Sequence, residues 1–405
     1  MTLSYIPSDT NDEGILKATA SGSLPNGKPV IVNADGTVSV VSGASGTEGI
    51  GSNVVYQNAA VDYPSSAYDS NSNRTVVAYR TSGAQYAAVG TVTASNNSIS
   101  WGTPVSPGGG GSSFNAATFD SSNNKIVLAN TATVRVATVD PSDNSISFGT
   151  AVNMPYAAQY VAATFDSNSN RVVIAFRKDG SPTDGWAVVG SVSGTNITLG
   201  TAVRFETGTT SNIAIAFDSN SNRVVIAYRD DSNANKPTAI VGSVDPSDNS
   251  ISFGTSGTYN TGNSYNIGCG FDSSSNKIVI TYRNSASGGN SYGTAVVGTV
   301  DPSDNSISFG TPVIFAEVTL NGSGVTYDVV AGKIVIAYAN GSNSTGGVIS
   351  GTVSGTTISF DTAVQYESGV VKYPGVAYDS TSSRVVISYE DDGSGTGIGT
   401  SAVFS

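Results

Sequence analysis

Short apolar runs separated by polar turns recur along the whole chain, and no segment sustains the periodicity of an amphipathic helix. Runs such as Val172–Ile174 and Ile278–Ile280 are apolar at consecutive positions, which indicates strands buried on both faces. Ser, Asn, Asp, Gly and Pro dominate the intervening segments, and these residues are typical of tight turns. The pattern predicts an all-β chain of many short strands.

An aromatic residue followed by aspartate marks a repeat along this chain. The steps between successive aspartates are 51, 46, 52, 54, 56 and 51 residues, and a lysine or arginine stands five residues after each one. Ten residues after the aspartate stands an aromatic residue in six of the seven copies. The aspartates are Asp69, Asp120, Asp166, Asp218, Asp272, Asp328 and Asp379. A period of about 50 residues indicates a repeat architecture.

Each repeat divides into four predicted strands. In the fourth repeat the first strand ends at Asp218, and a Ser-Asn-Ser-Asn turn leads to the second strand, RVVIAYR. The third strand is Thr238–Val244, and the turn Asp245–Ser250 joins it to the fourth, SISFGT. Four short strands per repeat predict an all-β, seven-bladed β-propeller with four-stranded blades.

The strand that closes the ring is predicted to come from the N-terminal side of the repeats. The last repeat has three strands and ends at Ser405. Tyr56 stands thirteen residues before the first aspartate, where five of the seven repeats carry an aromatic residue at the end of the preceding outer strand. We therefore expect Gly49–Gln57 to pair with Gly397–Phe404 as the missing fourth strand, which removes two exposed sheet edges.

The first 46 residues lie outside the repeat. Lys28–Val32 and Thr37–Val41 flank the turn Asn33–Gly36, which predicts a β-hairpin, and Ser42–Thr47 is a linker rich in Gly and Ser. We divide the chain into an N-terminal attachment segment, residues 1–46, and a propeller, residues 47–405. An isolated hairpin is marginally stable in water, so we expect it to pair with a partner surface or a second copy. The residues assigned to attachment are Lys28, Val30, Val32, Val38 and Val40.

Composition excludes several classes of function. With no histidine and one cysteine, the chain lacks a Ser-His-Asp or Cys-His nucleophile system, a histidine- or thiolate-bound metal cluster and an intrachain disulfide. The net charge of −12 disfavours binding to nucleic acid. No apolar run is long enough to span a membrane and no signal peptide is recognisable, so we expect a soluble protein made in a cytoplasm, without membrane insertion.

The charged residues that flank the first turn of each repeat are predicted to be structural. The aspartate caps the turn through its side chain, and the basic residue is expected to pair with it across the hairpin. The DPSDNS turns contain two aspartates, but the equivalent turns of other repeats lack carboxylates and none matches a calcium-binding loop. We therefore predict no metal and no cofactor.

The position eleven residues after the aspartate is the best candidate for ligand binding. Its residue varies between repeats on a fixed scaffold position, as expected of a ligand-contacting face and also of an unconstrained surface. The candidate ligand-binding residues are Arg80, Arg177, Arg229 and Arg283; the other repeats carry Thr131, Ala339 and Glu390.

Catalysis is not predicted. The glutamates Glu206, Glu317, Glu367 and Glu390 stand at unlike positions and define no acid–base pair for glycoside hydrolysis. Cys269 is interpreted as a small buried residue rather than a nucleophile. We therefore assign no catalytic residue and predict that the protein is not an enzyme.

The repeat resembles that of a group of viral proteins. It lacks the aspartate box of sialidases, the G-H and W-D pairs of WD-repeat propellers and the calcium loops of integrin-type propellers. The repeat DSNSNRVVIAYRD…AVVGTVDPSDNSISFGT resembles the Ser/Asn/Gly-rich repeats of structural proteins of marine bacteriophages, and GSLPNGKPVIVNADGTVSVV resembles their virion-anchoring starts. The resemblance implies a virion-surface protein, either a tail fibre or a capsid decoration, and carries over no binding residue.

This resemblance implies partners and a location. The N-terminal segment would attach to other virion proteins, and the propeller would face outward and adhere to host surface polysaccharide. Self-association into a homo-oligomer on the particle is left open. One alternative is a carbohydrate-binding propeller lectin not tied to a virus, which would not need residues 1–46 for attachment. A propeller glycoside hydrolase is the other alternative.

Overall fold

The computed structural model describes residues 19–20, 30–32, 36–40, 49–108, 116–285, 291–393 and 395–405. The chain divides into two compact units, Met1–Thr47 and Glu48–Ser405. Every regular element of the described residues is a β-strand, and none of these residues forms a helix long and apolar enough to cross a membrane.

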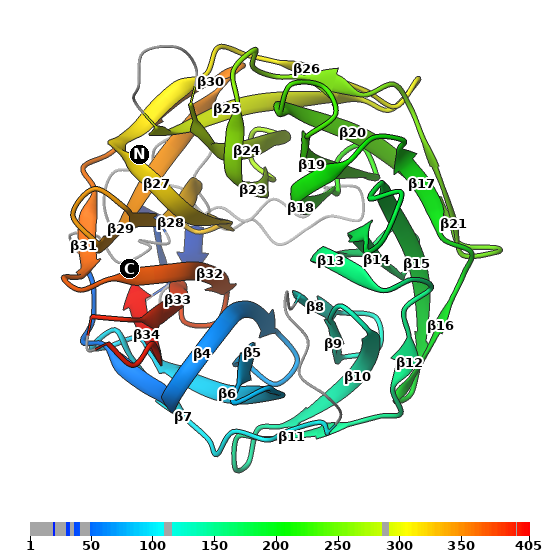
Figure 1. Ribbon diagram of the computed structural model, residues 1–405. Helices are drawn as coiled ribbons and strands as arrows, with labels where there is room; N and C mark the ends of the chain where they lie inside the picture. The colour runs from blue at the N-terminus through cyan, green and yellow to red at the C-terminus, as the bar shows by residue number, and fades with distance from the viewer. Residues whose placement is uncertain are drawn as a thin grey trace, which may run out of the picture. The chain divides into compact units, whose positions relative to one another are not determined.

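The larger unit is a ring of antiparallel sheets around a central axis, with one strand of each sheet innermost (Figure 1). The predicted all-β propeller fold is confirmed. Strand pairing groups the described strands of this unit into sheets that we call blades 1 to 7 in chain order. Two long strands, β4 (Val54–Asp69) and β27 (Val313–Asp328), each belong to two successive blades, because each leaves the rim of one blade and becomes the inner strand of the next.

In blades 1 to 6 the first four strands follow one another in the chain from the axis outward, whereas in blade 7 the outer strand comes from β4. Blade 1 contains β4, β5 (Arg74–Thr81), β6 (Ala84–Thr93) and β7 (Ser98–Trp101). Blade 2 contains β8 (Ala116–Asp120), β9 (Lys125–Ala129), β10 (Thr133–Asp140), β11 (Ser145–Phe148) and β12 (Val152–Asn153). Blade 3 contains β13 (Ala158–Asp166), β14 (Arg171–Lys178), β15 (Gly185–Ser193), β16 (Asn196–Leu199) and β17 (Val203–Glu206).

Blade 4 contains β18 (Thr210–Asp218), β19 (Arg223–Asp230), β20 (Lys236–Asp245), β21 (Ser250–Phe253) and β22 (Gly257–Thr258). Blade 5 contains β23 (Ser264–Asp272), β24 (Lys277–Asn284), β25 (Tyr292–Asp301), β26 (Ser306–Phe309) and the start of β27. Blade 6 contains the rest of β27, β28 (Lys333–Asn340), β29 (Thr345–Ser354), β30 (Thr357–Phe360) and β31 (Val364–Glu367). Blade 7 contains β32 (Val371–Asp379), β33 (Arg384–Asp391), β34 (Ile398–Phe404) and the start of β4.

The core lies between the blades. The second strands are buried on both faces, as their consecutive apolar residues predict; Val173 and Val225, for example, are 0% exposed. The two aromatic positions of the repeat meet there, because the residue thirteen before each aspartate packs on the residue ten after it. Their ring centroids lie 5.1 to 5.6 Å apart in the pairs Tyr56–Tyr79, Phe205–Tyr228, Tyr259–Tyr282, Phe315–Tyr338 and Tyr366–Tyr389.

The ring closes through the strand that the sequence predicts. Val54 and Gln57 of β4 pair with Ser401 and Gly399 of β34, and a bridge joins Ile50 to Phe404. The pairing extends on both sides, since the Ser405 amide donates to the Gly49 carbonyl at 3.0 Å and β4 remains paired with β34 as far as Ala60. The first and last parts of the propeller therefore share one sheet.

Each aspartate caps its turn as predicted. The Oδ1 atom of Asp218, for example, accepts backbone hydrogen bonds from Asn220 at 2.9 Å and Ser221 at 3.0 Å. The expected pairing of the basic residue with this aspartate is wrong. Arg223 instead reaches the next blade, where Nε donates to Asn305 Oδ1 at 2.5 Å and Nη2 donates to the Pro302 carbonyl at 2.7 Å.

The smaller unit contains the predicted hairpin. Its strands β2 (Val30–Val32) and β3 (Thr37–Val40) are antiparallel, with Val30 opposite Val40 and Val32 opposite Val38. A short strand, β1 (Thr19–Ala20), which the sequence analysis did not anticipate, pairs in parallel with β3. Of the residues assigned to attachment, the four valines lie in these strands and Lys28 lies outside the described residues.

Candidate functional site

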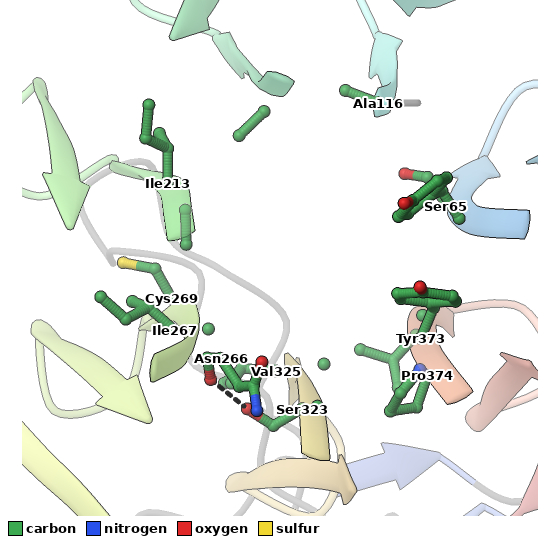
Figure 2. A pocket seen from close by; sticks show the side chains of 18 of the residues that line it. Ser65, Ala116, Ile213, Asn266, Ile267, Cys269, Ser323, Val325, Tyr373 and Pro374 are labelled. Carbon is green, nitrogen blue, oxygen red and sulfur yellow. Dashed lines mark hydrogen bonds between the residues drawn. The ribbon is translucent and has the colours of Figure 1, made fainter. Parts of the chain in front are cut away.

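The inner strands enclose a central cavity of about 380 Å³. Most of its wall is made of small or apolar residues, including Ala116, Ile213 and Val325, and Cys269 also lines it (Figure 2). Burial raises the pKa of the Cys269 thiol to about 12, so this group is protonated at neutral pH. Polar and aromatic groups of the lining gather where the inner strands begin.

A bulge six residues before the aspartate shapes this end of the cavity, which we call the mouth. The bulged residue has a positive φ of 50 to 52° and lines the cavity in five blades, at Tyr63, Tyr160, Asn212, Asn266 and Tyr373. Asparagine tolerates this backbone conformation, but for a bulky residue such as tyrosine it is an outlier. Three tyrosines held at the same strained position point to a role for their side chains.

Two of these tyrosines form an aromatic pair at the mouth. The rings of Tyr63 and Tyr373 lie 4.5 Å apart between centroids, with planes inclined by 44°. The side chain of Tyr373 is 39% exposed, which makes it one of the few accessible large apolar groups among the described residues. Partial burial and the neighbouring Tyr63 raise the pKa of Tyr373, so it is a neutral hydrogen-bonding phenol at physiological pH.

The bulge also decides where the predicted arginines lie. It shifts the strand register by one residue and so sets the residue eleven after the aspartate opposite the residue seven before it. The facing pairs are Asp62 and Arg80, Gln159 and Arg177, Ser211 and Arg229, Tyr265 and Arg283, and Lys372 and Glu390. The structure thus brings all four predicted arginines to the mouth.

Two of the facing pairs neutralise themselves. Arg80 lies 3.4 Å from Asp62 in an ion pair. In blade 7 the polarity is reversed: Lys372 lies 2.9 Å from Glu390 and 2.7 Å from Asp392. Hydrogen bonds to these two carboxylates raise the pKa of Lys372. This side of the mouth carries no excess positive charge in the described residues.

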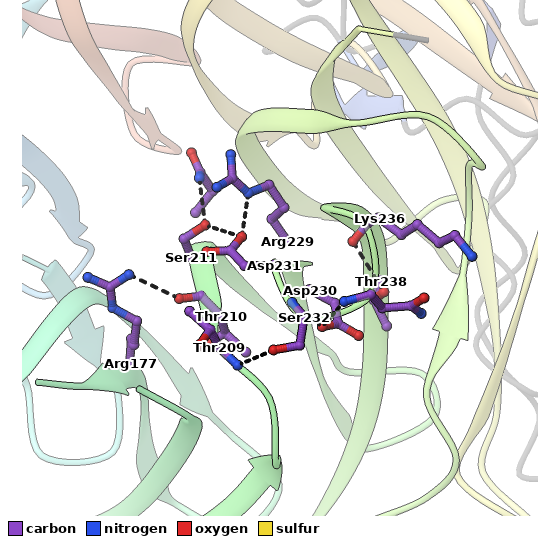
Figure 3. A network of polar contacts seen from close by, with 12 residues as sticks. Arg177, Thr209, Thr210, Ser211, Arg229, Asp230, Asp231, Ser232, Lys236 and Thr238 are labelled. Carbon is purple, nitrogen blue, oxygen red and sulfur yellow. Dashed lines mark hydrogen bonds and ion pairs between the residues drawn. The ribbon is translucent and has the colours of Figure 1, made fainter. Parts of the chain in front are cut away.

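The other three arginines are held by aromatic rings. The guanidinium of Arg177 lies 4.7 Å from the ring centroid of Tyr160, and those of Arg229 and Arg283 lie 4.5 and 4.3 Å from the ring centroid of Tyr265. Arg177 also donates to the Thr210 carbonyl and to Gln159, as Figure 3 shows for the former contact.

Arg229 and Arg283 differ in how their charge is balanced. Arg229 Nε lies 2.5 Å from Asp231 Oδ1, which also accepts a hydrogen bond from Ser211 at 2.9 Å (Figure 3). Within the described residues Arg283 has no carboxylate partner. Burial lowers the pKa of Arg283, and the charge of Arg229 lowers it further.

Two glutamates prove to be equivalent, so the prediction that they stand at unlike positions is wrong for them. Glu206 and Glu367 each accept a hydrogen bond from a tyrosine, at 2.9 Å from Tyr228 and 3.0 Å from Tyr389. Each also accepts two backbone amide hydrogen bonds in the turn that follows it. Tyr228 and Tyr389 are 0% exposed, so each glutamate provides a hydrogen-bond acceptor for a buried tyrosine hydroxyl. Each glutamate also stabilises the turn that follows it.

The remaining aromatic surface lies outside the cavity. Tyr156 is 37% exposed, packs on Trp186 at 4.9 Å between ring centroids, and carries Lys178 Nζ 5.3 Å above its ring. Neither ring lines the cavity. In the described residues no three His, Cys, Asp or Glu side chains gather closely enough to hold a metal ion.

Known structures share this fold but not this sequence. No family model matches the chain, and no curated protein sequence matches it. A protein of unknown function from Dyadobacter fermentans is 11% identical with a TM-score of 0.54, covering 88% of this chain and 98% of that one. A protein from Lactobacillus plantarum is 12% identical with a TM-score of 0.55, covering 87% and 96%. The Dos1 propeller is 10% identical with a TM-score of 0.50, covering 88% and 95%. At these identities the likeness shows the β-propeller fold alone.

Proposed function

We propose that this chain is a non-enzymatic, glycan-binding surface protein of a bacteriophage particle. Its N-terminal unit attaches to other virion proteins, and its propeller presents the mouth of the central cavity to host surface polysaccharide. The observation that carries the binding proposal is the set of bulged side chains, above all the exposed Tyr373 and the half-buried Tyr63 that packs on it. Their apolar faces suit the C–H face of a sugar ring, and their hydroxyls suit its polar edge.

Rigidity supports binding at this place. Asn212 Oδ1 accepts a hydrogen bond from the Asn266 amide at 2.9 Å, and Asn266 Nδ2 donates to the Leu320 carbonyl at 2.8 Å. These bonds tie blades 4, 5 and 6 together at the mouth. A ligand therefore meets groups that are already ordered, and less conformational entropy is lost on binding.

The carboxylates near the mouth support a non-enzymatic role. Asp62 pairs with Arg80, Asp231 pairs with Arg229, and Glu390 pairs with Lys372. A glycoside hydrolase needs two carboxyl groups across one glycosidic bond, one as acid and one as base or nucleophile. In the described residues these three carboxylates are each paired with a cation, whereas the neighbouring Asp230 accepts backbone hydrogen bonds from Ser232 and Asn233.

Attachment to a particle rests on the resemblance of the repeat and of the N-terminal stretch to marine bacteriophage structural proteins. In the described residues β3 is the central strand, between β1 and β2, so β2 forms an edge of this sheet to which another subunit's sheet can add. Display in many copies would raise the avidity of individually weak glycan contacts. The location implied is the virion surface.

The test separates the two units. The full chain and a propeller of residues 45–405 are mixed with particles stripped of this protein and, separately, with host cells. We expect that only the full chain rejoins particles, whereas the full chain and the isolated propeller both bind cells. Equal binding of the isolated propeller to particles would overturn the attachment role, and release of new reducing ends from the host polysaccharide would overturn the non-enzymatic assignment.

A further inference from the structure

Charge is distributed unevenly around the mouth. The protein has a net charge of −12, yet Arg177, Arg229 and Arg283 lie side by side in register on three successive blades. Among the described residues their one carboxylate partner is Asp231. Blades 7 and 1, on the other side, carry self-neutralised pairs. One arc of the mouth is therefore cationic on an otherwise acidic protein.

The closest cations of this arc share one aromatic ring. Both Arg229 and Arg283 lie over the ring of Tyr265, within 4.5 Å of its centroid. The ring attracts each guanidinium, but two like charges at this spacing repel one another. An anion that contacts both guanidinium groups would remove this repulsion and lower the free energy of the arrangement.

The terminal donors of Arg229 and Arg283 are available to such an anion, whereas Arg177 already donates to the Thr210 carbonyl and to Gln159. In the part of the chain that the structure describes, Arg229 uses Nε in its ion pair and no hydrogen bond engages its terminal nitrogens. The guanidinium of Arg283 lies against the ring of Tyr265, and within the described residues no hydrogen bond or ion pair engages its N–H donors. A guanidinium held by an aromatic ring presents a planar fork of N–H donors, which matches the oxygens of a carboxylate or a sulfate.

We propose that Arg229 and Arg283, with Tyr265 between their charges and Arg177 beside them, form a subsite for the carboxylate or sulfate group of an acidic polysaccharide. This inference rests on the proposed glycan-binding function and names its ligand class. Tyr63 and Tyr373 hold a sugar ring across the cavity from this arc. The cavity that Tyr63 and Tyr373 line, beside the arginines rather than lined by them, has a volume of about 380 Å³, within the usual range for small-ligand sites, roughly 300 to 1,000 Å³.

General electrostatic attraction does not account for such binding. A polyanion is repelled by the net charge of −12, so its affinity must come from local contacts. Replacing one arginine of the arc should therefore matter far more than replacing an arginine elsewhere with the same change in charge. Arg204 is the control of equal charge change, because its side chain is 45% exposed on the rim strand β17; it pairs with the buried Asp184 at 3.3 Å, so thermal unfolding of Arg204→Gln must show that the fold is kept.

The experiment compares three defined oligosaccharides by titration calorimetry with the full chain. These are an oligogalacturonate, a sulfated galactan oligomer and the desulfated galactan of the same length. We expect at least one acidic oligomer to bind about tenfold more tightly than the neutral one, a difference typical of one charge-assisted contact. The two acidic oligomers distinguish carboxylate from sulfate recognition.

Variants then locate the contact. Arg283→Gln and Arg229→Gln are expected to remove this preference and leave binding of the neutral oligomer unchanged, whereas Arg204→Gln retains it. Arg283→Lys, which keeps the charge but not the fork, is expected to retain part of it. Thermal unfolding of each variant verifies folding.

The outcomes separate the two proposals. Equal affinity for acidic and neutral oligomers overturns the anion subsite and leaves glycan binding standing. An acidic preference that survives Arg283→Gln and Arg229→Gln, or is lost in Arg204→Gln, also overturns the subsite. Absence of binding to all three oligomers and to polysaccharide extracted from host cells overturns both proposals.

Discussion

At the scale of single residues, a glycine in six of the seven blades sets how closely successive blades approach. It follows the fourth strand, and a Cβ atom on it would lie 2.2 Å from the Asn305 carbonyl oxygen for Gly254 and 1.7 Å from the Thr356 oxygen for Gly310. Gly51 meets the Asn97 oxygen in the same way, so the closing segment reproduces this feature of a fourth strand. Blade 6 carries Asp361 at this position instead, and Asp361 pairs with Lys333 at 2.9 Å.

Gly254→Ala is accordingly expected to destabilise the propeller by about 1 to 3 kcal/mol, the usual cost of overpacking, because the obstructing atom is backbone and cannot rotate away. Asp361→Ala at the equivalent position is the steric control, since a Cβ is already accommodated there and the substitution removes only the side-chain contacts with Lys333 and Ser350. Chemical denaturation measures both variants. Equal stability of Gly254→Ala and the parent protein would contradict the close approach of the blades.

The sequence of the repeat alone could not explain the role of the glycines after the fourth strand. Glycine in SISFGT is visible in the sequence, but the carbonyl that requires it lies in the next repeat. The bulge at Tyr63 and Tyr373 was missed for a similar reason, because strand pairing extended from Asp69 and Arg74 without a shift would set Asp62 opposite Thr81 rather than Arg80. A comparison of the repeats at six residues before the aspartate, where tyrosine and asparagine recur, was the signal that could have revealed it.

At the scale of elements, successive blades are joined by hydrogen bonds from the basic residue of one blade to the outer turn of the next. Where the next blade has a four-residue outer turn with a left-handed asparagine, the basic residue is arginine; it bonds that asparagine in the pairs Arg74–Asn144, Arg171–Asn249, Arg223–Asn305 and Arg384–Asn97. Lys125 and Lys277 precede blades whose outer turns are two residues long. A guanidinium can bond the asparagine and a turn carbonyl together, whereas an ammonium lacks this fork.

Arg223→Lys is expected to lower the free energy of unfolding by about 1 to 2 kcal/mol through loss of one or two hydrogen bonds. Lys277→Arg is the reciprocal control, with little effect expected, because blade 6 offers no asparagine at that place. A double-mutant cycle of Arg223→Lys with Asn305→Ala isolates the contact. Additive effects of the two substitutions would contradict direct coupling.

The closing strand is the second inference at this scale. Deleting residues 1–58 removes the partner of β34 and exposes a sheet edge, so we expect aggregation. Deleting residues 1–44 leaves β4 intact and is expected to give a soluble propeller with the thermal stability of the full chain. Light scattering and thermal unfolding compare the two truncations, and identical behaviour would contradict closure by β4. The missing fourth strand and Tyr56 made this element predictable from the sequence.

At the scale of the whole molecule, lowering the pH changes the stability of the propeller in two pH ranges, with opposite effects. Burial raises the pKa of Asp230, Glu390 and Asp391 above their ordinary values near 3.8 for aspartate and 4.5 for glutamate. The folded state then binds protons more tightly than the unfolded chain, so stability rises as the pH falls through these pKa values.

Below these values the sign reverses. Hydrogen bonds from serine hydroxyls lower the pKa of Asp140, Asp245, Asp301 and Asp361. Their contribution is complete above the ordinary value and is lost as the pH falls through the lowered one. We expect urea unfolding to show stability that rises as the pH falls toward the ordinary carboxyl pKa values and declines below them. A steady fall in stability from pH 7 to pH 5 would contradict this assignment.

The whole ring also explains why the site was only partly predictable. The four arginines were found from the variable position of the repeat, and the structure brings them to one end because every inner strand begins there. Their differences were not predictable. Arg80 meets Asp62 and Arg283 meets Tyr265 through cross-strand pairs that depend on the bulge, and Arg229 reaches Tyr265 from the neighbouring blade.

The mouth is the proposed place where a glycan binds, and the most direct test is the dissociation constant of the full chain for host surface polysaccharide after replacement of one mouth tyrosine. Tyr373→Asn removes the exposed ring but keeps a residue type that the bulge already carries at Asn212 and Asn266. Tyr156→Asn, outside the cavity, removes an equally exposed ring. We expect Tyr373→Asn to weaken binding about tenfold, or about 1.4 kcal/mol, and Tyr156→Asn to leave it unchanged. Unchanged binding in Tyr373→Asn, or an equal loss in Tyr156→Asn, would contradict a site at the mouth.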